Sequence, residues 1–250
     1  MSEPPAGSQP DLRVAEAESI RFHETAVADA ATIWRDGLNA LLRGLDVLIS
    51  HVTVGKDEDL LMAFIVHAWN TLYRAHEEAL RGYYSQALNL LRMPVEDFVA
   101  YWYVRSYPDK RPLFYRRSKH TPRVRAMLGG LRAKFREQMG EEEAEKQVEF
   151  VEQWINELAQ FSHIDRAGVW LVLTPVENRL DYRLGPIPDA DLFRFCTAHA
   201  LRSIGAHMEA LDNLRRLLGY EPLEDFAEWA DRIEQWQRAQ KPAGRDASPP

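Results

Sequence analysis

Residues 121–158, TPRVRAMLGGLRAKFREQMGEEEAEKQVEFVEQWINEL, decide the fold class of this chain. On both sides of Gly140, apolar residues recur every three or four positions, which places them on one face of each of two helices. Thr121 fits a helix cap with Pro122 at the first helical position, and Gly140 fits a helix end. Residues 141–143 are glutamates, which suit the positive end of a helix dipole. The stretch predicts two long antiparallel helices.

The same apolar spacing fills the sequence before this stretch. It predicts one long helix over residues 11–50, a second over 57–80 and a third over 85–102. Gly82 lies where a left-handed residue would end the second helix. Pro94 falls inside the third helix, where we expect a kink rather than two separate helices.

Beyond residue 158 the pattern changes and then becomes helical again. An apolar run at 169–173 and an alternating run at 179–184 predict a β-hairpin near 169–184. A long helix is expected from Asp189 to Gly219, and a final helix follows Pro222. The prediction is an all-α multi-helix bundle of long antiparallel helices with one small β-hairpin.

Composition sets the limits of this prediction. With 46% apolar residues the chain has enough to bury a large core, and we expect a single domain over residues 11–240 between disordered tails at 1–10 and 241–250. Because Cys196 is the single cysteine, an intrachain disulfide and a cysteine zinc cage are excluded. No run reaches the roughly 18 apolar residues of a membrane span, and no signal peptide is evident, so we expect a cytoplasmic protein without a membrane partner.

Positive charge is concentrated in one segment, residues 105–136. The chain holds 31 bases and 38 acids; this segment contains eleven of the bases and one acid, Asp109, so 20 bases and 37 acids remain elsewhere. The eleven bases are Arg105, Lys110, Arg111, Arg116, Arg117, Lys119, Arg123, Arg125, Arg132, Lys134 and Arg136. Such a segment either binds an anionic partner or is neutralised by an acidic element of the same protein.

Both outcomes are expected, in different halves of the segment. Arg125, Arg132 and Arg136 face the predicted helix that carries Glu141, Glu145, Glu149 and Glu152, so the two helices can screen each other. The first half has no acidic neighbour in sequence. The candidate anion-binding residues are therefore Lys110, Arg111, Arg116, Arg117 and Lys119.

The third predicted helix carries a polar stripe at Gln86, Asn89, Arg92 and Glu96. If this face is buried, Arg92 and Glu96 form a desolvated ion pair that requires full hydrogen bonding. If it is exposed, the stripe is the solvated side of an amphipathic helix. The sequence leaves both alternatives open.

Gly82-Tyr83, the Arg92 and Glu96 pair, and Phe161-Ser162-His163 resemble a pattern in bacterial helical-bundle families of unknown function. The resemblance covers residues 60–215 and implies a shared polar centre of Arg92, Glu96, Ser162 and His163. It implies no reaction.

A second resemblance is to the HEPN ribonucleases, whose motif is an arginine followed after four to six residues by a histidine. Two pairs have this spacing, Arg194 with His199 and Arg202 with His207. The resemblance implies metal-independent RNA cleavage with histidine as general base. The asparagine that usually follows the arginine is replaced by Phe195 and Ser203, and about 2.4 such pairs are expected by chance.

These observations favour a non-catalytic helical-bundle protein that binds nucleic acid or another polyanion through the basic segment. The alternatives are a HEPN-like ribonuclease and a pocket for a small anionic ligand around Arg92, Glu96 and His163. Metal ligands and cofactors are not expected, because Glu-x-x-His pairs and a phosphate-binding loop are missing from the sequence. The leading interpretation leaves a homodimer open.

Overall fold

The computed structural model describes residues 11–51, 56–115, 121–162, 173–176, 179–182, 186–223 and 225–240. The helices are α1 (Leu12–Ala26), α2 (Ala28–His51), α3 (Lys56–Leu80), α4 (Tyr84–Ser106), the 3-10 turn η1 (Pro108–Lys110), α5 (Pro112–Tyr115), α6 (Val124–Met139), α7 (Glu141–Ser162), α9 (Ala190–Leu217) and α10 (Asp225–Gln240). The predicted helical bundle is confirmed. Residues 1–10 and 241–250, expected to be tails, lie outside the described residues.

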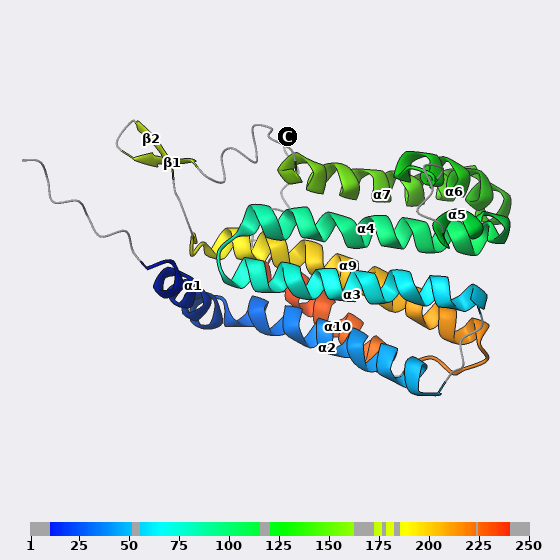
Figure 1. Ribbon diagram of the computed structural model, residues 1–250, viewed down its shortest axis with the longest axis horizontal. Coiled ribbons are helices and arrows are strands. Elements are labelled where there is room, and N and C mark those ends of the chain that lie inside the picture. Colours follow the sequence, from blue (N-terminus) through cyan, green and yellow to red (C-terminus); the bar gives the residue numbers. More distant parts are fainter. Residues whose placement is uncertain are drawn as a thin grey trace, which may run out of the picture.

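Four long helices, α2, α3, α4 and α9, run side by side along the molecule, and α7 lies along α4 (Figure 1). Their facing sides form the main core, which includes Trp34, Leu72, Leu91 and Ile204. A smaller core joins α4 to the α6–α7 hairpin through Val99, Leu131 and Val148, among others. The apolar spacing seen in the sequence therefore marks the buried face of each helix.

Two short strands, β1 (Leu173–Val176) and β2 (Arg179–Tyr182), pair antiparallel with Leu173 opposite Tyr182. Figure 1 draws them beside the end of the bundle that also holds α1. In the part of the chain that the structure describes, no helix is long and apolar enough to cross a membrane.

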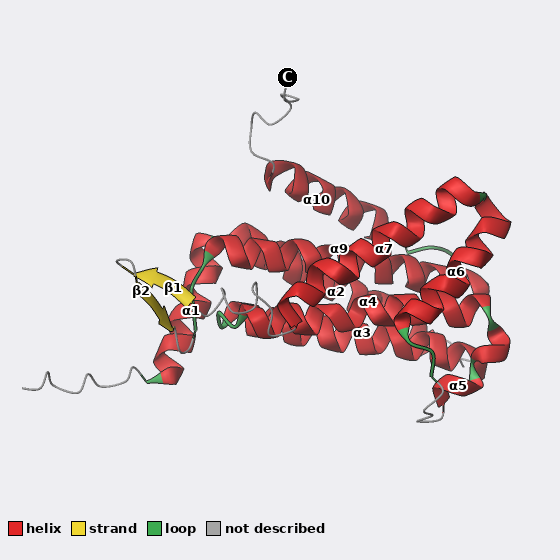
Figure 2. Cartoon of the chain, turned by 90° about the horizontal axis from the view of Figure 1, so that it is seen from above, coloured by secondary structure: helices red, strands yellow, loops and turns green. Residues whose placement is uncertain are grey.

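The single helix expected over residues 11–50 is wrong, because the chain breaks at Val27 into α1 and α2. Val27 leaves the helical conformation with φ −131° and ψ 39°, and its side chain is buried. The break turns α1 across the end of the bundle (Figure 2). There His23 lies 3.0 Å from the Leu80 carbonyl oxygen through Nδ1, and its Nε2 contacts the Tyr84 hydroxyl at 2.5 Å.

Gly82 ends α3 with φ +84°, as predicted, and its location explains why glycine is needed there. A Cβ atom on this residue would lie 2.7 Å from the Ile187 backbone nitrogen and 2.8 Å from the Ser19 Oγ. The Ile187 backbone N–H donates to the Gly82 carbonyl oxygen at 3.3 Å. The turn between α3 and α4 is thereby joined to α1 and to the segment that precedes α9.

We expect Gly82→Ala to lower the free energy of unfolding by about 2 kcal/mol or more, because left-handed backbone and a backbone clash both oppose the methyl group. Gly129→Ala is the matched control: Gly129 lies within α6 with open space around its Cα. The Gly129→Ala change should raise the free energy of unfolding by about 0.5–1 kcal/mol. Urea denaturation measures both, and equal effects of the two substitutions would contradict the role given to Gly82.

Among the described side chains, four histidines are buried: His23, His76, His199 and His207. Burial lowers the pKa of His23, and it lowers the pKa of His76, His199 and His207 to about 4. The folded protein therefore holds them neutral at a pH where the unfolded chain, with histidine pKa near 6.5, already takes up protons. Their contribution to stability is complete above pH of about 6.5 and is lost as the pH falls toward about 4.

Each such histidine should contribute a slope of up to about 1.4 kcal/mol per pH unit to the unfolding free energy in this window. We expect His207→Leu to reduce this slope by up to about 1.4 kcal/mol per pH unit relative to the wild type, which corresponds to the uptake of one proton. Urea denaturation between pH 7 and pH 4.5 measures the slope. Ile49→Leu provides the control, because this exposed apolar change on α2 leaves the four buried rings in place. An unchanged slope in the His207 variant would show that the buried ring is protonated in the folded state.

Candidate anion-binding surface

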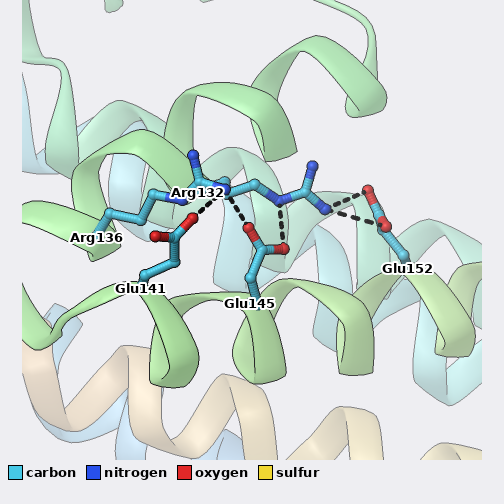
Figure 3. A network of polar contacts seen from close by, with 5 residues as sticks. All are labelled: Arg132, Arg136, Glu141, Glu145 and Glu152. Atoms are coloured by element: carbon cyan, nitrogen blue, oxygen red, sulfur yellow. Dashed lines mark hydrogen bonds and ion pairs between the residues drawn. The ribbon is translucent and has the colours of Figure 1, made fainter.

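The second half of the basic segment is neutralised inside the α6–α7 hairpin (Figure 3). Arg132 bonds Glu145 at 3.1 Å and Glu152 at 3.3 Å. Arg136 pairs with Glu141 at 3.3 Å and also with Glu145. The expected screening by the acidic helix is confirmed for these two arginines, which therefore need no external anion.

The described part of the first half, residues 105–115, contains the end of α4, η1 and α5, and α5 lies at the end of the bundle next to α6 (Figure 1). Lys110 pairs with Asp109 at 3.0 Å, and this hydrogen bond raises the pKa of the exposed lysine. Arg111 is half-buried in the turn between η1 and α5. The other three candidates, Arg116, Arg117 and Lys119, lie outside the described residues.

Thr121 does not cap α6, which is a correction to the sequence interpretation. Its hydroxyl donates to the Leu113 carbonyl oxygen at 3.2 Å, and α6 begins at Val124 with Arg123 as the cap residue. The hydrogen bond holds the start of α6 against α5. The bases on both sides of the undescribed stretch are thereby brought to one end of the molecule.

Arg123 and Arg125 are exposed at the start of α6, and neither makes an ion pair with the residues that the structure describes. The Arg123 side chain makes no capping hydrogen bond, and the first turn of α6 has no acid. We call Lys110, Arg111, Arg123 and Arg125 the basic end. The sequence analysis placed Arg123 and Arg125 in the half of the segment that the acidic helix was expected to neutralise. The first turn of α6 contains no acid, and this feature of the sequence could have indicated that the two arginines are unpaired.

The polar stripe of α4 faces outward. Arg92 Nε bonds Glu96 Oε1 at 2.9 Å, and the two side chains are 31% and 36% exposed. With α3 residues that include Arg74 and Glu77, they line a hollow of about 1080 Å³ between α3 and α4. The desolvated ion pair is thereby ruled out. His163 and the Ser162 side chain lie outside what the structure describes, so the polar centre implied by the family resemblance stays a prediction.

His67 and Asp97 form a second polar pair between α3 and α4 that sequence reasoning missed. His67 Nδ1 lies 2.7 Å from Asp97 Oδ2, with side-chain exposures of 52% and 15%. Burial raises the pKa of the Asp97 carboxyl, while the hydrogen bond from His67 opposes that shift. Because the two residues are thirty positions apart on different helices, no local sequence pattern could have joined them.

The histidines of the two HEPN-like pairs lie in the core, and their arginines bind acids on other helices. Arg194 donates to both Asp29 carboxylate oxygens at 2.8 and 3.0 Å, and Arg202 pairs with Glu157 at 3.3 Å. His199 and His207 are 6% and 0% exposed. His207 Nδ1 bonds the Ser203 carbonyl oxygen at 2.8 Å. The structure does not gather the four side chains on one accessible surface.

Cys196 is fully buried, and burial raises the pKa of its thiol. Among the described residues, no group of three or more histidine, cysteine, aspartate or glutamate side chains could hold a metal ion.

No protein-family model, no curated protein and no solved structure matches this chain. This result agrees with the resemblance to bacterial helical bundles of unknown function, and it assigns no activity.

Proposed function

We propose that this protein is a non-catalytic helical bundle that binds a nucleic acid, or a similar polyanion, through the basic end. The observation that carries the proposal is the start of α6, where Arg123 and Arg125 are exposed beside a helix terminus that has no acid in its first turn. Arg132 and Arg136 are excluded from the binding surface because α7 neutralises them.

Three features of the basic end suit phosphate groups. The first backbone N–H groups of a helix have no partner within the helix and carry partial positive charge, which attracts anions. Arg123 and Arg125 add full charges at the same place. Lys110 of η1, which is paired with Asp109, and Arg111 in the turn before α5 are the other bases of this end. Tyr115, 54% exposed at the end of α5, offers a ring on which a base could stack.

A cytoplasmic location and a homodimer belong to the same proposal. Single-stranded RNA is accessible in the cytoplasm, and a dimer would present two basic ends to one polyanion, which increases binding strength without new contacts.

The double variant Arg123→Ala/Arg125→Ala should weaken binding of a fluorescent single-stranded RNA at low salt. Removing two phosphate contacts should also reduce the slope of log affinity against log salt by about 1.4. The matched control is Arg13→Ala/Arg21→Ala, which removes the same charge from exposed positions of α1. Fluorescence anisotropy across a salt series, with a DNA of equal length beside the RNA, makes the measurement.

An equal loss of RNA affinity in the two double variants would contradict a localised site. Undetectable RNA binding by the wild type at low salt would end the proposal. Replacing Arg116, Arg117 and Lys119 with alanine tests the remaining candidates of the segment. The RNA is also checked for length after incubation: cleavage that disappears in His199→Ala and His207→Ala would replace the non-catalytic proposal with the HEPN-like one.

A second candidate function is supported by the hollow between α3 and α4. Arg74, Arg81 and Arg92 line it, and Arg74 makes no ion pair with any described residue. A small anion, such as a phosphate or a carboxylate, would be held there by Arg74 and by Arg92, which Glu96 already orients.

For this candidate, inorganic phosphate should raise the melting temperature of the wild type, and Arg74→Gln/Arg92→Gln should remove the increase. Sodium chloride of equal ionic strength controls for screening. The Arg123→Ala/Arg125→Ala variant should keep the full effect, since its changes lie at the other site. Stabilisation that survives in Arg74→Gln/Arg92→Gln but is lost in that variant would move the phosphate to the basic end.

A further inference from the structure

A cavity of about 320 Å³ lies between α4, α6 and α7. This volume falls within the range of about 300–1000 Å³ that is typical of small-molecule sites. Its lining residues are Phe98, Val99, Trp102, Leu128, Leu131, Phe135, Gln138, Met139, Gln147, Val148, Val151 and Glu209. The cavity borders the smaller of the two cores and contains no residue of the basic end.

The walls of this cavity are apolar and partly aromatic. Phe98 and Trp102 of α4 meet edge to face, with ring centroids 6.3 Å apart. Phe135 of α6 and Val148 of α7 contribute the opposite side. Such walls select a ligand with an apolar body and present ring faces to any cation beside them.

Among the described residues that line the cavity, Glu209 has the single ionisable side chain. It is also the one exposed residue in the stretch 196–213 of α9. Among the described residues it has neither an ion-pair nor a hydrogen-bond partner, although surrounding atoms displace water and raise the pKa of its carboxyl. A carboxylate that has lost part of its hydration without gaining a partner gains free energy when a cation binds beside it.

Glu209 is also accessible from outside the cavity. It lines two adjacent hollows toward α10, of about 350 and 390 Å³, together with Gly205 one turn earlier on α9. A Cβ atom on Gly205 would meet no atom within 4 Å, so the space in front of α9 is open at this point. A ligand can therefore approach along α9 and place its apolar body between α4, α6 and α7.

We propose that this cavity binds a small hydrophobic cation, an amine or ammonium ion with an aromatic or aliphatic body, whose charge faces Glu209. The described lining also includes Gln138 and Gln147, whose amide oxygens can accept hydrogen bonds from an amine. This site shares no residue with the basic end, so it is independent of the proposed polyanion binding.

Thioflavin T, a hydrophobic cation that fluoresces when its rotation is restricted, is a suitable probe, and the anionic dye ANS is a comparison of similar size. We expect saturable thioflavin T binding at one site per chain and weaker ANS binding. Glu209→Gln should weaken thioflavin T binding at least about tenfold, as expected for loss of a charge-assisted contact, and should leave ANS binding equal or stronger.

The matched control is Glu149→Gln, an equal charge change at an exposed position of α7 that does not line the cavity. It should leave both dyes unaffected. Val151→Phe, which narrows the cavity, should weaken binding of both dyes. Circular dichroism and urea denaturation confirm that each variant is folded, and the Arg123→Ala/Arg125→Ala variant should bind thioflavin T like the wild type.

Three results would overturn the proposal: no saturable thioflavin T binding to the wild type, equal affinity in Glu209→Gln, or ANS binding as tight as that of thioflavin T. None of these bears on the basic end, because RNA binding by the Glu209→Gln variant is measured separately and should be unchanged.

Discussion

The burial of α9 is the constraint on which the rest of the structure depends. This helix packs against α2, α3 and α4, and along residues 196–213 Glu209 is the one residue that is exposed as a whole. Its histidines His199 and His207 therefore stay neutral near pH 7, because burial disfavours the charged ring. The same burial withdraws both histidines from solvent.

Ion pairs within the α6–α7 hairpin divide the basic segment into a neutralised part and an exposed part. Because α7 follows α6 in a tight antiparallel hairpin, its glutamates face Arg132 and Arg136, whereas Arg123 and Arg125 at the start of α6 make no ion pair with a described residue. Ion pairs at such exposed positions contribute little to stability, so their main effect is on where positive potential remains. It remains at the end of the molecule where Thr121 holds α6 against α5.

Most helices, and the turn at Gly82, could be predicted because both depend on local chemistry. Apolar spacing fixes the buried face of a helix, and a left-handed turn favours glycine. The break at Val27 could not be predicted, since apolar spacing continues across it. The break is stabilised by contacts of His23 with Leu80 and Tyr84, about sixty residues away in the sequence. Thr121 likewise bonds the carbonyl of Leu113, eight residues earlier on another helix, instead of capping its own helix.

The sequence by itself determined the all-α class, the neutralisation of Arg132 and Arg136, and the polar stripe of α4, because each follows from residues within one helix or one hairpin. Only the tertiary structure decided which polar groups meet solvent. It turned Arg92 and Glu96 outward, buried His199 and His207, joined His67 to Asp97, and placed Glu209 beside an apolar cavity. The physical reason is that exposure depends on which helices pack together, and that packing sums weak apolar contacts over the whole chain.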